Sequence, residues 1–246
     1  MSVMDSKKLR LKNPFRQQSK SKKNASGLIR EAIFGINDGL VATVGLVSGE
    51  ALAHQPHRAV LIAALSAVGA AVVSMSVGSY LATVSENEFM QKEIYEQKSL
   101  IERRPERERR HVRRLLQQIG LPQTAVAPVE ANIVRSRSRW LEFMVREHLG
   151  IHLERQERPL QNALVMGVAV MVGSAPPVLP FFLPLSITTA RNATWALAVI
   201  SALALGGLKA KVTHTSIWRS ALWFGVLVSL SSLVGSVVGL LAGKVA

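Results

Sequence analysis

The chain contains no cysteine in its 246 residues, which excludes disulfide bonds and thiolate metal ligands. It also lacks a glycine-rich phosphate loop, a nucleophile motif and the HExxH zinc signature. We therefore expect no enzyme, and an ATP-driven pump would lack its machinery. Acidic residues are scarce as well, with 16 Asp and Glu against 30 Lys and Arg, which gives a net charge of +14.

Apolar sequence, in contrast, is abundant, at 48% hydrophobic residues. Long apolar windows occur at residues 32–49, about 59–84, 163–185, 193–208 and 217–243. A helix needs about 20 predominantly apolar residues to cross a bilayer. The sequence therefore predicts an all-α membrane protein with five transmembrane helices. The first of them is read as an uncleaved span, because no convincing cleavage site follows it.

The distribution of positive charge predicts how the chain is oriented. Lysine and arginine are frequent before Glu31, in 85–160 and in 209–219, and sparse in the connections 50–58 and 185–192. Because short cationic loops stay in the cytoplasm, this alternation predicts a cytoplasmic N-terminus and a C-terminus on the other side. The membrane is expected to be a bacterial inner membrane, or a vacuolar or other organelle membrane in a eukaryote.

Four regions follow from these patterns. They are a disordered basic arm at 1–27, transmembrane helices one and two at 28–84, a cytoplasmic helical domain at 85–160, and transmembrane helices three to five at 161–246. The basic arm lacks the aromatic interleaving and the recognised module of a nucleic-acid binder. Its lysines are better suited to anionic lipid and to fixing topology. We expect the lipid bilayer, and no nucleic acid, as a partner.

Asp38 is the only ionisable residue of the first apolar window, 32–49. A carboxylate at membrane depth costs roughly 2.5–3.5 kcal/mol on insertion scales, so such residues usually face a polar pathway or a partner. Glu31 lies seven residues earlier, two turns away on the same helix face. This pair indicates a route for cations or protons. The alternative is that Asp38 caps a helix break beside Gly35 and Gly39.

Met75 lies in the middle of the second window, between Ser74 and Ser76. A thioether that faces the Asp38 carboxylate would suit Fe²⁺ or Mn²⁺ better than Na⁺ or Ca²⁺. The alternative is packing, because a lone methionine in a membrane helix most often fills space.

Small residues and prolines mark the other spans. Glycines recur at four-residue spacing in the first and last spans, and small residues crowd the second. Such faces suit close helix pairing, within the chain or in a homodimer. The third window carries Pro176, Pro177, Pro180 and Pro184. They predict either a broken helix whose free carbonyls line an ion cavity, or the exit turn of a helix that ends near Ser174.

The stretch 85–160 has apolar residues at three- to four-residue spacing and no run long enough to span a membrane. A break near Pro105 separates a first helix from a second. We expect a loop with Pro122 and Pro128 to follow, and then a third helix at about 138–157. The sequence thus predicts a three-helix cytoplasmic domain inserted between spans two and three.

Several possible metal ligands share helix faces in this domain. They are Glu93 with Glu96, Glu108 with His111, Met144 with Glu147, and His148 with His152. Carboxylate and imidazole suit Mn²⁺, Fe²⁺ or Zn²⁺, and a thioether favours a softer metal. The alternative is a solvated surface, because Glu106/Arg110 and Glu142/Arg146 have the spacing of ion pairs worth only about 0.3–0.5 kcal/mol each.

Two segments resemble the vacuolar iron transporter family. REAIFGINDGLVATVGLVSG resembles the first span of that family, with its (E/D)-x-I-x-G-x-N-D-G-L signature, and SMSVGSYLATVSENEF resembles the second span and its continuation. RRPERE, FMVREHLGI and GSAPPVLPFFL follow in family order, so the resemblance covers about residues 28–243. It implies a dimeric five-span antiporter that moves Fe²⁺, and often Mn²⁺, out of the cytosol against protons.

The resemblance also assigns roles to residues. It implies an ion path at the interface of a homodimer, lined by Glu31, Asp38 and Met75, and cytoplasmic metal capture through Glu108, Met144 and Glu147. In this scheme Asp38 alternates between a proton and the transported metal. No cofactor is expected, since Fe²⁺ or Mn²⁺ is the transported substrate.

The chain also departs from the family pattern. Ser79 stands where the family has a second-span glutamate, and Gln97, Leu100 and His111 stand where cytoplasmic acids are expected. Glu93 and Glu96, one turn displaced, are the expected substitutes. Two other functions therefore stay open: a transport-inactive metal-sensing or scaffolding membrane protein, and an exporter of another cationic solute such as an amine.

Overall fold

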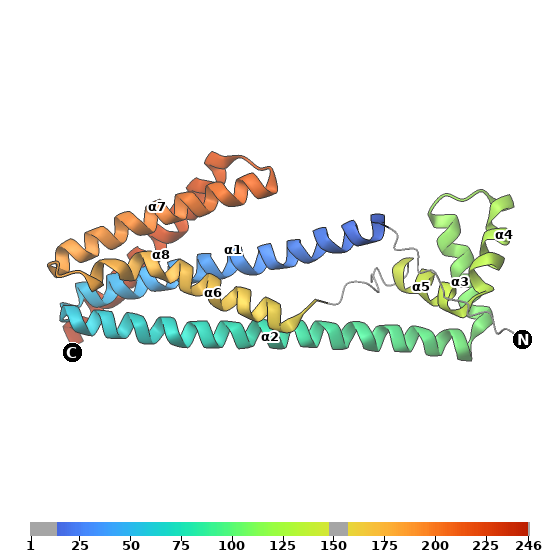
Figure 1. The fold of residues 1–246 in the computed structure, drawn as a ribbon, viewed down its shortest axis with the longest axis horizontal. Coiled ribbons are helices and arrows are strands. Elements are labelled where there is room, and N and C mark those ends of the chain that lie inside the picture. The colour runs from blue at the N-terminus through green and yellow to red at the C-terminus, as the bar shows by residue number, and fades with distance from the viewer. Residues whose placement is uncertain (1–13, 148–156, 246) are drawn as a thin grey trace, which may run out of the picture. The chain divides into compact units, whose positions relative to one another are not determined.

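The computed structural model describes residues 14–147 and 157–245, and over these residues the chain forms helices and turns with no strand (Figure 1). In chain order the elements are α1 (Pro14–Leu52), α2 (His57–Arg103), α3 (Pro105–Gln118), α4 (Gln123–Val134), α5 (Arg137–Glu147), α6 (Pro159–Val178), the 3₁₀ helix η1 (Leu179–Phe182), α7 (Ile187–Thr213) and α8 (Ile217–Val245). The predicted all-α class is confirmed. α1 begins at Pro14, inside the segment 1–27 for which the sequence predicts disorder, and residues 1–13 lie outside the described residues.

Five helices of the described part are long and apolar enough to cross a membrane, which confirms the predicted number of spans. They are Gly27–Leu52, His57–Arg103, Pro159–Phe182, Ile187–Thr213 and Ile217–Lys244. α7 is longer than the apolar window 193–208, because polar residues extend it at both ends. Ser186 caps its start by accepting a hydrogen bond from the Thr189 N–H at 3.2 Å. Arg191 therefore belongs to the helix and not to a connection.

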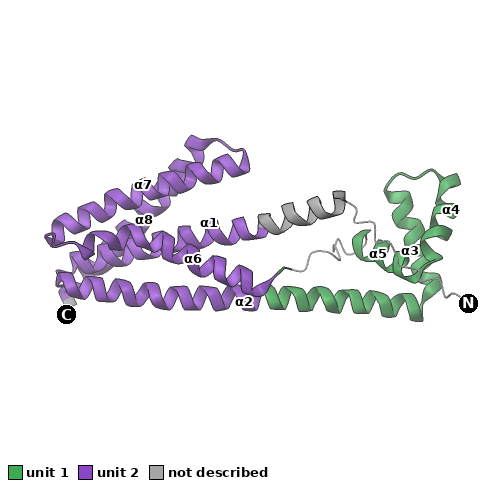
Figure 2. Ribbon diagram, in the orientation of Figure 1, with its two compact units in different colours: residues 1–26, 83–157 green, residues 27–82, 158–246 purple. Residues whose placement is uncertain are grey.

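The helices form two compact units (Figure 2). The polar unit holds residues 83–147 and 157, and the membrane unit holds 27–82 and 158–245. α2 contributes to both, because it continues without interruption from its apolar part to Arg103.

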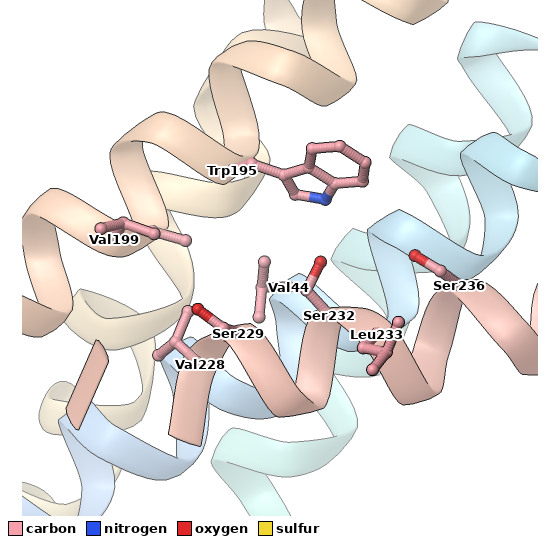
Figure 3. A pocket seen from close by; sticks show the side chains of 9 residues that line it. Val44, Trp195, Val199, Val228, Ser229, Ser232, Leu233 and Ser236 are labelled. Carbon is pink, nitrogen blue, oxygen red and sulfur yellow. The ribbon is translucent and has the colours of Figure 1, made fainter. Parts of the chain in front are cut away.

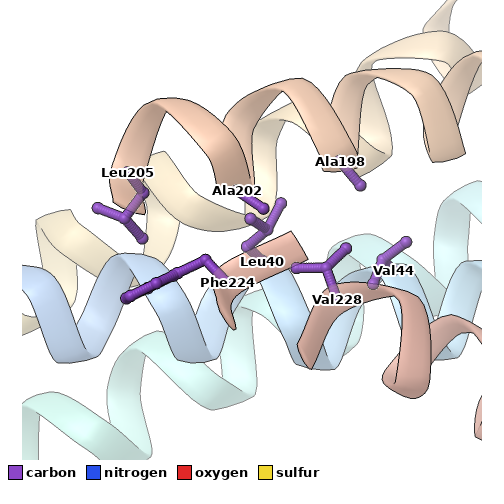
Figure 4. Close-up of a cluster of buried hydrophobic side chains, with 7 residues drawn as sticks. All are labelled: Leu40, Val44, Ala198, Ala202, Leu205, Phe224 and Val228. Carbon is purple, nitrogen blue, oxygen red and sulfur yellow. The ribbon is translucent and has the colours of Figure 1, made fainter. Parts of the chain in front are cut away.

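The core of the membrane unit is built around α1. Figure 4 shows one buried cluster, made of Leu40 and Val44 of α1, Ala198, Ala202 and Leu205 of α7, and Phe224 and Val228 of α8. A second cluster joins the end of α1 to α2, α6, η1 and α7, through Val47, Ala51, Val60, Ala64, Val178, Phe181 and Ala190. Half of the apolar window of α1 is buried, against 11% for α2. The window of the third span is 56% buried, so α1 and α6 are the most enclosed spans and α2 is the least buried.

Glycines allow α1 to approach its neighbours closely. A Cβ atom on Gly239 of α8 would collide with the backbone carbonyl of Gly49, and a Cβ atom on Gly173 of α6 would collide with that of Ile36. Ser231 of α8 adds a hydrogen bond to the Val41 carbonyl at 2.7 Å. The small-residue faces of the first and last spans therefore pair within the chain.

The prolines of the third span lie at its end. α6 passes through Pro176 and Pro177 to Val178 and then tightens into η1. The helix is therefore unbroken in its middle, and it ends after the predicted position near Ser174. Prolines remove backbone donors and leave acceptors free. One of these acceptors, the Pro177 carbonyl, takes a hydrogen bond from the buried Thr194 hydroxyl at 2.8 Å.

The polar unit packs around a core of its own. Its buried residues are Ile101 of α2, Val112 and Leu116 of α3, Val126 and Ile133 of α4, and Trp140 and Met144 of α5. The predicted break at Pro105 is confirmed, since α2 ends at Arg103 and α3 begins at Pro105. The predicted loop with Pro122 and Pro128 is wrong, because α4 occupies Gln123–Val134.

The physical reason for α4 is its buried face. Val126, Glu130 and Ile133 recur at helical spacing and face the core, which outweighs the backbone hydrogen bond lost at Pro128. The described part of the polar unit therefore has one helix more than predicted. Of the third predicted helix, α5 is present up to Glu147, and residues 148–156 lie outside the described residues.

Candidate functional site

Asp38 lies in the middle of the first span and lines a small hollow between α1, α2 and α6, of about 80 Å³. The hollow is otherwise lined by Gly39, Ala42, Thr43 and Leu46 of α1, Ala64, Ala67, Val68 and Ala71 of α2, and Ser174 of α6. The Ser174 hydroxyl donates to the Gly39 carbonyl at 3.2 Å, which ties α6 to α1 at this level. α1 continues through Asp38 without interruption, so the alternative that Asp38 caps a helix break is wrong.

Glu31 is held two turns earlier on α1, where it is 9% exposed. One carboxylate oxygen accepts a hydrogen bond from the Ser79 hydroxyl of α2 at 3.0 Å, and the other accepts one from the Arg30 guanidinium at 3.2 Å. Arg30 is 67% exposed, so solvent screens its ion pair. The contact with Ser79 joins the two helices, and it involves the position where the sequence departs from the pattern of the family that it resembles.

Met75 lies between the levels of these two acids. On α2, Ala71 lines the Asp38 hollow and Ser79 binds Glu31, and Met75 is one turn from each on the same helix face. Its side chain is partly buried. Along α1, the seven residues from Glu31 to Asp38 correspond to a rise of about 10 Å. The structure therefore arranges carboxylate, thioether and carboxylate in order along the α1–α2 pair.

This arrangement suits a divalent transition metal. Two ionised carboxylates carry the charge that balances one M²⁺ ion, which lowers the free-energy cost of placing the ion at membrane depth. Oxygen and thioether ligands together favour Fe²⁺ or Mn²⁺ over harder cations.

The polar unit brings one predicted ligand pair together. Glu108 is 3% exposed and accepts a hydrogen bond from the Gln97 side-chain amide at 3.0 Å. The Nδ1 atom of His111 lies 4.0 Å from the same carboxylate oxygen. Glu108 and His111 thus share the helix face that their spacing predicts.

The other predicted ligands have different surroundings. Met144 is fully buried in the apolar core, and Glu93 is partly buried. Glu96 pairs with Lys92 at 3.7 Å, and Glu147 pairs with Arg146 at 3.3 Å. Among the described residues, no group of three or more His, Cys, Asp or Glu side chains lies close enough to hold a metal. His148 and His152 lie outside the described residues.

Glu130 is the buried acid that the sequence interpretation missed. It is 3% exposed and lies 2.8 Å from an Arg113 guanidinium nitrogen and 3.3 Å from Arg109 Nε, both on α3. The signal was present in the spacing of Val126, Glu130 and Ile133, but the predicted loop obscured it.

Comparison with known proteins gives a consistent result. The model of the VIT family matches residues 29–240. "Vacuolar iron transporter 1" of Arabidopsis thaliana is 32% identical over 200 residues, which cover 80% of this chain and 79% of that protein. "Vacuolar iron transporter 1" of Oryza sativa subsp. japonica is 30% identical over 208 residues, covering 83% of this chain and 81% of that protein. The fungal "Vacuolar iron transporter cccA" of Arthroderma benhamiae is 24% identical over 220 residues, covering 88% of this chain and 76% of that protein.

Proposed function

This chain belongs to the VIT family, and from that premise we propose that it is a proton-coupled antiporter that exports Fe²⁺ or Mn²⁺ from the cytosol. Family membership and the five apolar helices make it an integral membrane protein that transports metal. The names of its relatives support iron as a substrate. Coupling to protons, the transport of Mn²⁺ and the direction of transport are our inference.

One observation carries the proposal most strongly: Asp38 lines a hollow within the first span, and Glu31 is buried two turns away along the same helix pair. The two carboxylates lie about 10 Å apart along α1, so they would bind the ion one after the other, and together they balance its charge; the protein is also neutral here when both acids are protonated. Either state can exist at membrane depth at lower cost than two bare charges. Exchange of metal for protons follows from this balance, with Met75 as the soft ligand between the two acids.

The expected orientation gives the exchange its direction. With the N-terminus and the polar unit in the cytoplasm, Glu31 lies on the cytoplasmic side of Asp38. Metal would meet Glu31 first, pass Met75 and reach Asp38. Protons would use the same groups in the opposite direction.

The polar unit has a second proposed role, the capture of cytosolic metal. Its strongest candidate ligands are Glu108 and His111, because their side chains lie within 4.0 Å of each other. Glu93, Glu96 and Glu147 are additional carboxylates on the same unit. The burial of Met144 supports a packing role for that thioether.

We further propose a homodimer formed through α2. Its apolar window is 11% buried, the lowest value of the five spans. A Cβ atom added to Gly69 would meet nothing within 4 Å, and Ser66, Ala70 and Ser74 are exposed on the same half of the helix. An exposed face of small residues permits close approach of a second helix in lipid.

Metal flux in proteoliposomes with an imposed pH gradient tests the transport proposal. We expect uptake of Fe²⁺ or Mn²⁺ to require the gradient, and Asp38→Asn to abolish it while the protein still inserts. Glu50→Gln is the matched control, because it removes the same charge from α1 at a position that does not line the hollow. Full flux in Asp38→Asn contradicts the proposal.

A transport-inactive sensor is the second candidate, and the hydroxyl of Ser79 favours it. Ser79 supplies a neutral oxygen beside Glu31, where the family pattern has a third carboxylate. Metal binding by the purified protein without flux in liposomes would support this function. Competition by organic amines, but not by Fe²⁺, would instead indicate an exporter of another cation.

A further inference from the structure

A second and larger cavity lies between α1, α7 and α8 (Figure 3). Its volume is about 300 Å³, and it is lined by Val44, Trp195, Ala198, Val199, Val228, Ser229, Ser232, Leu233 and Ser236. From Val228 to Ser236 it follows α8 for about 12 Å. Val199 and Leu233 are exposed at its rim. The cavity therefore opens on the outer surface of the membrane unit, which faces lipid.

Most polar groups in this cavity are already paired. The Trp195 indole N–H donates to the Ser48 hydroxyl at 2.8 Å, and that hydroxyl lies 3.0 Å from the Ser232 hydroxyl. Ser229 donates to the Gly225 carbonyl of its own helix at 2.8 Å. A ligand in the cavity therefore meets mainly apolar surface, which suits a hydrocarbon chain.

Arg191 adds a cation next to the cavity. It precedes Trp195 by one turn of α7, and its guanidinium carbon lies 5.0 Å from the centre of the Trp195 ring. One terminal nitrogen donates to the Asn192 side chain at 3.4 Å. Its Nε atom is buried and has no hydrogen-bond partner among the described residues. Buried donors are normally paired, so this nitrogen leaves the guanidinium incompletely satisfied, and the side chain as a whole is partly exposed to an acceptor from outside the chain.

We propose that this site binds one anionic phospholipid, with the phosphate at Arg191 and an acyl chain in the cavity. Arg191 lies in the second turn of its span, at the level where phosphate groups and interfacial tryptophans meet. Basic pockets between membrane helices bind anionic headgroups in this way, and guanidinium groups pair strongly with phosphate. The proposal combines charge complementarity with an apolar cavity, and it does not depend on what the protein transports.

Trp195 itself provides the measurement, through quenching of its fluorescence by acyl-brominated lipids. Trp218 and Trp223 are 86% and 68% exposed, so both can be changed to Phe with little loss of packing. Trp140 is buried in the core of the polar unit and gives a constant background. In liposomes that contain this double variant, we expect brominated phosphatidylglycerol to bind at the Trp195 site about fivefold more tightly than brominated phosphatidylcholine. This factor corresponds to about 1 kcal/mol for one basic residue at an anionic headgroup.

Two variants and one control locate the site. Arg191→Gln should remove the preference for phosphatidylglycerol, and Ser236→Phe should remove it by filling the cavity. Arg58→Gln should retain it, because Arg58 is an exposed cation at the start of another span. Excess soluble glycerol phosphate should have no effect. Three results would each overturn the proposal. They are equal quenching by both lipids, a loss of the phosphatidylglycerol preference in Arg58→Gln as large as in Arg191→Gln, and a decrease in quenching by brominated phosphatidylglycerol when glycerol phosphate is added.

Discussion

Single residues decide how α1 and α2 are joined at the candidate path. The Ser79 hydroxyl donates to a Glu31 carboxylate that is 9% exposed, and hydrogen bonds to charged groups contribute about 1.5–3 kcal/mol. We predict that Ser79→Ala and Glu31→Gln each lower the free energy of unfolding. Ser79→Ala removes the donor and Glu31→Gln removes the negative charge of the acceptor, so both changes act on the same charge-assisted hydrogen bond, and the double variant should cost about 1 kcal/mol less than the sum of the two single changes. Chemical unfolding in detergent micelles measures this coupling, and strictly additive losses would show that the bond contributes little.

The Glu130 carboxylate makes a comparable prediction for the polar unit. Glu130→Gln leaves Arg109 and Arg113 without their buried partner, and breaking a buried pair costs 3–5 kcal/mol when both ions stay buried. The two arginines are 42% and 54% exposed, so water compensates in part and we expect a loss of about 2 kcal/mol. Glu106→Gln is the matched control, since Glu106 pairs with Arg109 but is 74% exposed. Equal effects of the two changes would contradict the assigned role of Glu130.

At the scale of elements, the α1–α8 contact depends on glycine. A side chain at Gly239 would collide with the Gly49 backbone, whereas one at Gly207 of α7 would make only an ordinary contact at 3.9 Å. We predict that Gly239→Ala destabilises the membrane unit by about 1–3 kcal/mol, and that Gly207→Ala is neutral or slightly stabilising. Thermal unfolding of the purified variants tests this, and tolerance of Gly239→Ala would mean that the two helices do not approach so closely.

The elements also show what can be read from sequence and what cannot. Apolar length is a local property, so all five spans were predictable from their windows. The start of α7 was not, because a serine cap and polar first turns carry no hydropathy signal. α4 was missed because Pro128 indicates a loop locally, while the burial of Val126 and Ile133 depends on tertiary packing. For the same reason the spacing of Glu31 and Asp38 predicts a shared face, but only the structure places Ser79 against Glu31.

At the scale of the whole molecule, the proposed dimer can be tested because the chain has no cysteine. A single Ser74→Cys variant places one thiol on the exposed side of α2, and Ile200→Cys places one on α7, at a side chain 61% exposed. Disulfides form only when Cα atoms come within about 7 Å. We predict cross-linked dimers under mild oxidation for Ser74→Cys and few for Ile200→Cys. Single cysteines at Gly69 and Gly78 sample the other exposed sides of α2. Absence of cross-linking in Gly69→Cys, Ser74→Cys and Gly78→Cys alike would exclude α2 as the interface.

Proton-coupled metal transport is tested by following metal and protons in the same vesicles. Liposomes that contain a metal-sensitive dye and a pH-sensitive dye would receive Fe²⁺ or Mn²⁺ from outside, with wild-type protein, Asp38→Asn or Glu50→Gln in the membrane. We predict that metal entry and proton exit proceed together in the wild type and in Glu50→Gln, and that both stop in Asp38→Asn. Metal entry without proton movement, or coupled exchange that persists in Asp38→Asn, would contradict this prediction.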